Sequence, residues 1–307
     1  MAPQKTISTA AWIGLGLMGL MWGGSFLSIE LMLRQLPVET LVALRVAGGA
    51  TVLWLYVIIA RLPVPRDVAT WFAFLWIGFL NVALPFALIT WGQQHIASGL
   101  AGILNAATAI FGPLVAALLF ADERLGARKA VGVTLGFFGV ATVLGLEALH
   151  SFDLRSAGQL ALIGAALCYA FGVAAVRQYL GGVRSEVSAA GMIAGAALWM
   201  VPVALFRNGW PDFGTFNATT LGAWAYISIF STALTYLILF RVIKAAGSGN
   251  ATLVTLFVAP VSVILGTVVL GERLPPSAIA GFVLIALGLL VIDGRLVAWL
   301  RHRARHS

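Results

Sequence analysis

Charged residues are scarce in this sequence. Asp, Glu, Lys and Arg make up 10% of its 307 residues, while hydrophobic residues make up 61%. Soluble domains have about 25% charged residues, and a soluble chain of this length could not bury so much apolar surface. This composition excludes an ordinary soluble enzyme or binding domain, and it predicts that lipid surrounds most of the chain.

Cysteine is almost absent. Cys168 is the single cysteine and lies inside an apolar segment, so neither an intramolecular disulfide nor a cysteine-rich metal site can form. Motifs of intramembrane proteases, such as Gly-x-Ser-Gly, His-Glu-x-x-His and Gly-x-Gly-Asp, are also absent. We therefore predict no catalytic residues, no metal and no cofactor, and a membrane enzyme is the least favoured alternative.

Apolar stretches of about 20 residues, the length that a helix needs to cross a bilayer, occur ten times. The sequence therefore predicts an all-α integral membrane protein with ten transmembrane helices, near residues 11–33, 38–60, 70–91, 97–121, 129–148, 157–179, 187–206, 219–240, 248–271 and 276–298.

Basic residues exceed acidic ones by 19 to 11, but they are dispersed between the apolar stretches. Such dispersion argues against a nucleic-acid partner. Fourteen Lys and Arg residues fall on the side shared by both termini and four on the other, with Arg45 inside a helix. By the positive-inside rule, both termini are predicted to be cytoplasmic, in a bacterial-type inner membrane.

An internal repeat relates the two halves of the chain. Leu20-Met21-Trp22 matches Leu167-Cys168-Tyr169, Ala83-Leu84-Pro85-Phe86 matches Ala233-Leu234-Thr235-Tyr236, and Glu123-Arg124-Leu125 matches Glu272-Arg273-Leu274. We assign residues 1–150 and 151–307 to two five-helix repeats. Because five is odd, the second repeat is inverted, which is typical of transporters; duplication without functional consequence is the alternative.

With these matches in place, the sequence resembles a known family. Trp22-Gly23-Gly24-Ser25-Phe26, Leu44-Arg45, Pro113, Pro260 and the paired Glu-Arg-Leu motifs are similar to those of EamA-type members of the drug/metabolite transporter superfamily. Within it, the chain looks most like the YddG-type aromatic amino-acid exporters. The resemblance implies a basket of helices 1, 3, 4, 6, 8 and 9 around a central cavity, with helices 5 and 10 outside. Glu30 departs from the family, which commonly has a cation there.

Aromatic and uncharged polar residues recur at matching places in both halves. Helical spacing puts Trp22, Phe26 and Glu30 on one stripe of the first helix, and Tyr169 on the matching stripe of the sixth. Such groups inside a membrane favour a wet interior, although ordinary helix packing is an open alternative. The candidate substrate-binding residues are Trp22, Phe26, Asn81, Phe86, Asn105, Thr108, Tyr169, Ser231, Thr235, Tyr236 and Thr252.

Three ionisable residues form a separate candidate group, a charge pair or gate. Arg45 lies about 10 Å inside the second predicted helix, and Glu30 lies near the same outer end of the first. We predict that they pair, as a structural tie or as a substrate contact. His95 is expected in the outer loop between helices 3 and 4, where it could titrate or be merely solvated.

The charge pattern also restricts the solute. The bundle interior has no cluster of Lys and Arg, which argues against strongly anionic cargo, and no mid-membrane carboxylate, which argues against glutamate-centred cation antiport. We therefore expect a monomeric exporter of a neutral or zwitterionic solute, an aromatic or large hydrophobic amino acid, working by alternating access. A passive channel or facilitator and an exporter of other metabolites or drugs are the alternatives.

Overall fold

A computed structural model of the chain describes residues 8–120, 126–144, 154–246 and 254–293. Eight helical segments in these ranges are long and apolar enough to cross a membrane. Two shorter apolar helices, Phe257–Leu270 and Pro276–Ile292, account for the ninth and tenth predicted segments. The all-α, ten-helix fold class is thereby confirmed.

The spans of the first half are α1 (Thr9–Leu33), α2 (Val38–Ile59), a third built of α3 (Val68–Gly78), the π-helical η1 (Phe79–Ala83) and α4 (Leu84–Gln93), a fourth built of α5 (Ser98–Asn105) and α6 (Thr108–Leu119), and α7 (Ala127–Leu144). Those of the second half are α9 (Leu154–Tyr179), α10 (Ser185–Asn208), a span built of α11 (Ala218–Ala225), the π-helical η3 (Tyr226–Leu234) and α12 (Thr235–Ala246), then α14 (Thr255–Leu270) and α15 (Pro276–Asp293). A short 3₁₀ turn, η2 (Phe213–Thr215), precedes α11.

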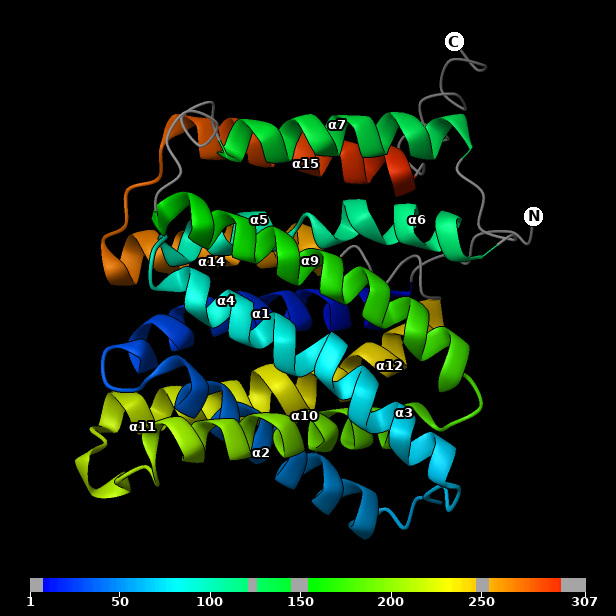
Figure 1. The fold of residues 1–307 in the computed structure, drawn as a ribbon. Helices are drawn as coiled ribbons and strands as arrows, with labels where there is room; N and C mark the ends of the chain where they lie inside the picture. Colours follow the sequence, from blue (N-terminus) through cyan, green and yellow to red (C-terminus); the bar gives the residue numbers. More distant parts are fainter. Residues whose placement is uncertain (1–7, 121–125, 145–153, 247–253, 294–307) are drawn as a thin grey trace.

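The helices lie roughly side by side, and α1 begins where α15 ends (Figure 1). We call this end of the bundle the proximal end, and the opposite end, where α1 ends and α9 begins, the distal end. Packing partners are exchanged between the halves: α1 packs on α14, as α9 packs on α5 and α6. The contacts of α2 with α10 and of α7 with α15 pair equivalent helices. This pattern is that of an inverted repeat.

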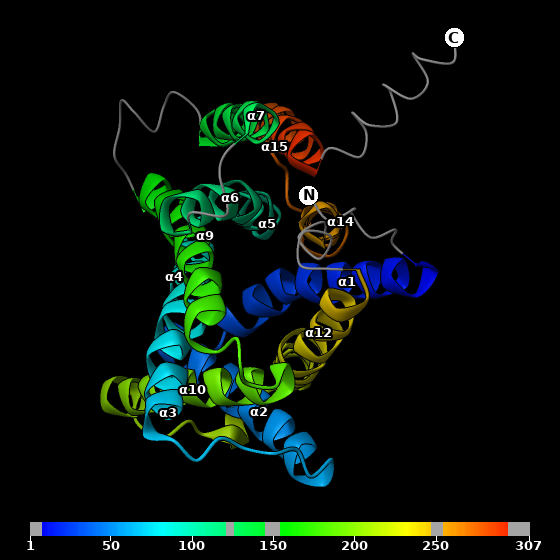
Figure 2. The same cartoon turned by 90° about the vertical axis from the view of Figure 1, so that its right-hand side faces the viewer.

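Helices α7 and α15 stand outside the ring formed by the other spans (Figure 2), as the resemblance implied. Glycines allow their backbones to approach closely. A Cβ atom on Gly139 would lie 2.8 Å from the carbonyl oxygen of Gly281 and 2.8 Å from the amide nitrogen of Ile285. Gly132 meets Gly288 in the same way. The pair therefore packs through backbone contact, as small residues permit in membranes.

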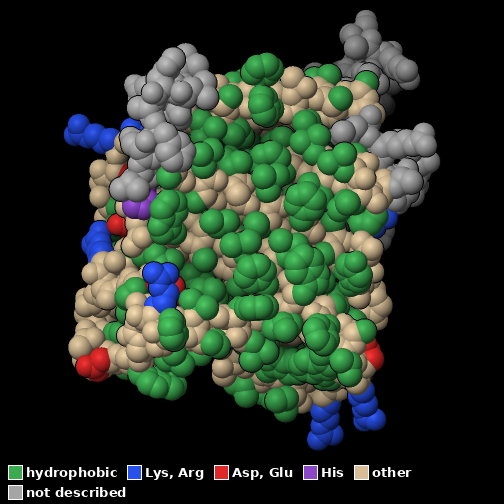
Figure 3. Space-filling model, in the orientation of Figure 1, with side chains coloured by type: hydrophobic (Ala, Val, Ile, Leu, Met, Phe, Trp, Pro, Cys, Tyr) green, Lys and Arg blue, Asp and Glu red, His purple; other side chains and the backbone are tan. Residues whose placement is uncertain are grey.

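The outer surface is apolar between the two ends of the bundle. In Figure 3 hydrophobic side chains cover the middle of the visible face, and charged side chains lie toward its ends. Individual large side chains are nearly fully exposed, among them Phe206 at 93%, Ile59 at 79% and Leu118 at 79%. Exposure of this kind is tolerated because lipid tails, and not water, cover these positions.

One carboxylate links the two halves at the distal end. Gly271 ends α14 in the left-handed region (φ 69°), where glycine is favoured, and Glu272 follows. The Glu272 oxygens Oε1 and Oε2 accept hydrogen bonds from the amides of Ser98 (2.7 Å) and Gly99 (2.9 Å). These amides are unpaired donors at the start of α5, so a carboxylate there also complements the helix dipole. Its repeat counterpart, Glu123, lies outside the described residues.

We expect Gly139→Ala to destabilise the protein by about 1–3 kcal/mol, the usual cost of forcing an extra methyl group into a packed contact. Thermal unfolding of the purified protein in detergent measures this change. Gly16→Ala is the matched control, because a Cβ atom on Gly16 meets nothing within 4 Å. Equal melting temperatures for the two variants would contradict the close approach of α7 and α15.

Glu272→Gln should lower the melting temperature for two reasons. One carboxylate oxygen that accepts a hydrogen bond from a backbone amide would become an NH₂ donor, and the negative charge that faces the α5 amides would be lost. Loss of a charge-assisted hydrogen bond costs about 1.5–3 kcal/mol. Asp67→Asn is the comparison: Asp67 caps α3 through the Thr70 amide at 2.8 Å, and asparagine is an equally good N-cap residue. A Glu272→Gln protein as stable as Asp67→Asn would remove the link between the halves.

Candidate functional site

Trp22, near the middle of α1, is held by the second half of the chain. Its indole Nε1 donates a hydrogen bond to the backbone carbonyl of Ser231 in η3, at 3.1 Å. An indole N–H inside a membrane needs such a partner. The side chain of Ser231 is buried, whereas Trp22 is only partly buried. The bond fixes one edge of the indole, and part of its surface stays accessible.

Arg45 is buried in the same region, with 4% of its surface exposed. Its Nε donates to the hydroxyl of Thr232 at 3.2 Å, and its Cζ lies 3.6 Å from the centre of the Phe86 ring. A cation over an aromatic face is stabilised by the ring quadrupole. Spans from both halves, α2 and α4 on one side and η3 on the other, therefore surround this guanidinium.

Tyr169 of α9 and Tyr236 of α12 complete the surroundings of Arg45. Both tyrosines lie within electrostatic range of Arg45 and of each other. Both are partly buried and pack against the hydrophobic cluster that contains Phe86. We call these six residues the aromatic–arginine cluster: Trp22, Arg45, Phe86, Tyr169, Thr232 and Tyr236. Trp22 and Tyr169 are repeat equivalents, as are Phe86 and Tyr236, so each half contributes two matching aromatics.

The position of Arg45 depends on close packing of α2 against η3. One turn after Arg45, a Cβ atom on Gly49 would lie 2.6 Å from Cγ2 of Thr232, so only glycine lets the helices approach this far. The Thr232 hydroxyl donates to the carbonyl of Ile227 at 2.7 Å. Because the hydroxyl proton is used in this bond, the Thr232 oxygen can only accept from Arg45.

Two π-helical segments occur at equivalent places in the two halves, and the sequence did not predict them. Phe79–Ala83 ends two residues before Pro85, whose ring cannot continue a regular helix without displacing a carbonyl. In the second half Thr235 replaces Pro85, and its hydroxyl donates to the carbonyl of Phe230 at 2.6 Å. Proline in one half and hydroxyls in the other thus support similar π segments, which are frequent at functional sites.

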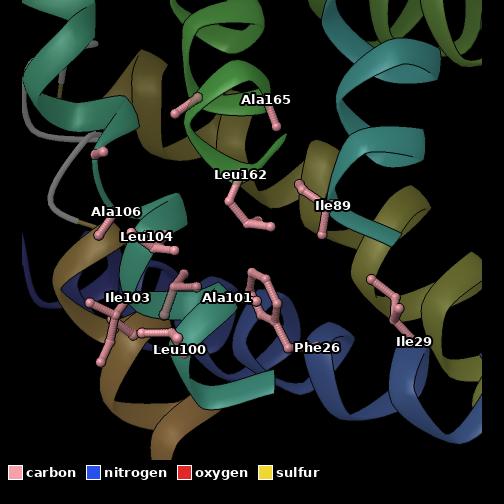
Figure 4. Close-up of a cluster of buried hydrophobic side chains, with 14 of the residues drawn as sticks. Phe26, Ile29, Ile89, Leu100, Ala101, Ile103, Leu104, Ala106, Leu162 and Ala165 are labelled. Carbon is pink, nitrogen blue, oxygen red and sulfur yellow. The ribbon is translucent and has the colours of Figure 1, made fainter. Parts of the chain in front are cut away.

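Phe26 lies in a hydrophobic cluster toward the distal end. It is 3% exposed, and in Figure 4 its ring points from α1 toward Leu162 of α9, beside α5. The carbonyl of Phe26 also accepts a hydrogen bond from Nε2 of Gln93 at 2.9 Å. Sequence analysis missed Gln93, because a single glutamine near a helix end gives no signal.

The two ends of the bundle differ at repeat-equivalent positions. Phe26 is 3% exposed at the distal end, whereas its counterpart Val173 is 64% exposed on the proximal side. Val173 lies one turn from Tyr169 on the same stripe of α9. These two repeat-equivalent positions therefore differ in burial: Phe26 packs in the interior, and Val173 is exposed.

The remaining polar candidates lie on other elements. Asn81 is buried against Gly172 of α9. Asn105 and Thr108 flank the break between α5 and α6, and their side-chain oxygens have no hydrogen-bond partner among the described residues. Thr235 is fully buried, and its hydroxyl donates to the carbonyl of Phe230. Thr252 lies outside the described residues.

The predicted ion pair between Glu30 and Arg45 is wrong. Within the described ranges Arg45 contacts Thr232 and Phe86, and the charges acting on Glu30 are those of Arg34 and Glu272. The depths differ: Arg45 lies about two turns inside α2, while Glu30 lies in the last turn of α1. The guanidinium of Arg45 therefore stands in the cluster without Glu30 beside it.

His95 lies in the connection between α4 and α5, as predicted. Its ring packs edge-on against Trp91, with the ring centres 4.7 Å apart. Its Nε2 is buried without a hydrogen-bond partner in the part of the chain that the structure describes. His95 thus lies against the end of α4 and beside Gly158 of α9, and no contact that the structure describes joins it to the aromatic–arginine cluster.

Two inverted sets of five spans, with a polar and aromatic cluster between them, define a polytopic membrane transporter. The chain belongs to the EamA-like transporter family, which it matches twice, over residues 10–145 and 156–293. Each match contains five of the ten spans.

Relatives of this chain are named transporters. An uncharacterized transporter of Archaeoglobus fulgidus is 24% identical over 286 residues, covering 92% of this chain and 98% of that protein. A probable amino-acid metabolite efflux pump of Salmonella typhimurium is 26% identical, with 88% and 90% coverage. A probable terminal-alkyne amino-acid exporter of Streptantibioticus cattleyicolor is 25% identical, with 68% coverage of both chains. One crystal structure shares the fold, with a TM-score of 0.67, 20% identity and coverage of 95% and 99%.

Thr232→Val should weaken the contact between the halves, because it leaves the Arg45 Nε–H without its acceptor. A buried donor without a partner costs about 1–3 kcal/mol. Thermal unfolding in detergent measures the loss, and Thr232→Ser should restore most of it. Thr51→Val is the control, since the Thr51 hydroxyl bonds the Ala47 carbonyl at 2.9 Å on the exposed face of α2. A Thr232→Val protein as stable as Thr51→Val would contradict this role.

Proposed function

We propose that this transporter exports amino acids, aromatic or large hydrophobic ones in particular, across the inner membrane by alternating access. The aromatic–arginine cluster carries this proposal. It lies between the two inverted halves, and three of its aromatic side chains, Trp22, Tyr169 and Tyr236, are only partly buried. A flat aromatic side chain of a solute can stack on such faces.

The chemistry of the cluster suits an amino acid. Aromatic faces attract an ammonium group by cation–π interaction, and they also accept an apolar side chain. Two relatives whose names mention amino-acid export or efflux, from Streptantibioticus cattleyicolor and Salmonella typhimurium, support the same class of solute. The inverted arrangement of the two halves supports alternating access, because two such halves can expose a shared site to either side in turn.

The orientation belongs to the same proposal. Both ends of the described chain lie at the proximal end of the bundle, and the excess of Lys and Arg on that side favours the cytoplasm. Both termini would then face the cytoplasm.

Counterflow in proteoliposomes tests the function. Vesicles preloaded with unlabelled phenylalanine should accumulate labelled phenylalanine in a saturable manner, and empty vesicles should not. Non-saturating flux without stimulation by solute inside would favour a channel. Absence of uptake for all twenty amino acids would exclude amino-acid transport.

Trp22→Ala and Tyr236→Ala should each raise KM roughly tenfold, which corresponds to about 1.4 kcal/mol of lost binding. Trp76→Ala and Tyr179→Ala are matched controls, because these side chains are 50% and 58% exposed on the outer surface or at a helix end. Unchanged KM values for Trp22→Ala and Tyr236→Ala would remove the site assignment.

A further inference from the structure

Arg45 is a buried cation that no carboxylate neutralises within the described ranges. The groups around it are the hydroxyl of Thr232, the ring of Phe86 and, within electrostatic range, the phenols of Tyr169 and Tyr236. Taking a charge out of water costs several kcal/mol unless a counter-ion or hydrogen bonds compensate. Hydroxyl groups and a ring face compensate only in part, so the site favours an anionic group beside the guanidinium.

Among the residues that the structure describes, no acidic side chain is placed to supply that group. The described carboxylates lie at helix ends or in loops: Glu30 near Arg34, Glu39 with Arg207 at 2.8 Å, and Glu272 on the α5 amides. No acidic residue occurs near the middle of any predicted span. A solute must therefore bring the negative charge.

The arrangement around Arg45 also limits the negative charge of the solute to that of one carboxylate. Arg45 is the single basic residue near the middle of a predicted span, and its repeat-related helix, α10, has its basic residue Arg207 in its last turn. One guanidinium matches one carboxylate in bidentate geometry. A phosphate or a dicarboxylate would leave charge uncompensated at the same depth.

We propose that Arg45 binds the carboxylate of the transported solute and thereby selects monocarboxylates over amines, amides and alcohols of the same shape. This inference rests on the proposed function and names the recognition group within the same cluster. Thr232 orients the guanidinium from Nε, Phe86 supports it from one face, and the partly buried Trp22, Tyr169 and Tyr236 receive the rest of the solute.

The first test uses the unaltered protein and solutes that differ in one group. L-phenylalanine should inhibit counterflow of labelled phenylalanine at least tenfold better than L-phenylalaninamide or 2-phenylethylamine. The acid 3-phenylpropionate should compete better than 3-phenylpropionamide. Equal inhibition by acid and amide would overturn the proposal.

The second test changes the arginine. R45Q should raise KM for phenylalanine at least tenfold and abolish the preference for acid over amide, while R45K should retain part of that preference. R207Q is the control for loss of one positive charge, because Arg207 is 65% exposed at its side chain and pairs with Glu39. A structural role alone would lower kcat or stability and leave the preference for acid intact, which would overturn the assignment.

Two further readouts keep the test decisive. Size-exclusion profiles and melting temperatures show whether R45Q is folded, and if it is not, R45K and the solute series decide. If no amino acid is transported, stabilisation of the purified protein by 3-phenylpropionate but not by its amide, lost in R45K, would keep the carboxylate site and reject amino-acid export. Equal melting temperatures with acid and amide would overturn the carboxylate site.

Discussion

The contact between Arg45 and Thr232 is the interaction on which the rest of the site depends. It joins a helix of the first half to a π segment of the second, and it exists because Gly49 lets the two helices approach. A guanidinium in this position is costly in a medium of low dielectric constant. The surrounding hydroxyl and ring reduce that cost without cancelling it, and this remaining cost is the basis of the proposal that the cluster binds an anionic group.

Much of the fold could be predicted because the physics of a bilayer leaves few options. Hydrophobic runs of sufficient length gave ten spans, and the repeat with its odd helix number gave the inverted halves. Within the site, the repeat-related pairs Trp22 with Tyr169 and Phe86 with Tyr236 could be identified from their alignment and helical spacing alone. The structure places Phe86, Tyr169 and Tyr236 around Arg45 and bonds Trp22 to Ser231, the residue before Thr232.

Tertiary geometry decided what the sequence could not show. The partner of Arg45 depends on the depth and rotation of α2, so the expected pairing with Glu30 failed. The π segments were missed because hydrophobic periodicity does not distinguish an inserted residue within an apolar helix. Phe26 shares a stripe with Trp22 but packs into the distal cluster, since a stripe specifies direction and not which part of it stays accessible.

Two contacts, α2 with α10 and α7 with α15, join each helix to its own repeat equivalent, and these self-paired contacts have a geometric consequence. An axis that exchanges the two halves must pass between α2 and α10 and between α7 and α15, because each of these pairs consists of equivalent helices. If the halves swap conformations, the contacts of α1 with α14 and of α9 with α5 and α6 trade places, while the two self-paired contacts map onto themselves. The glycine-lined seam of α7 and α15 would then serve as a fulcrum, keeping the same backbone contacts while the solute passes from one face of the bilayer to the other.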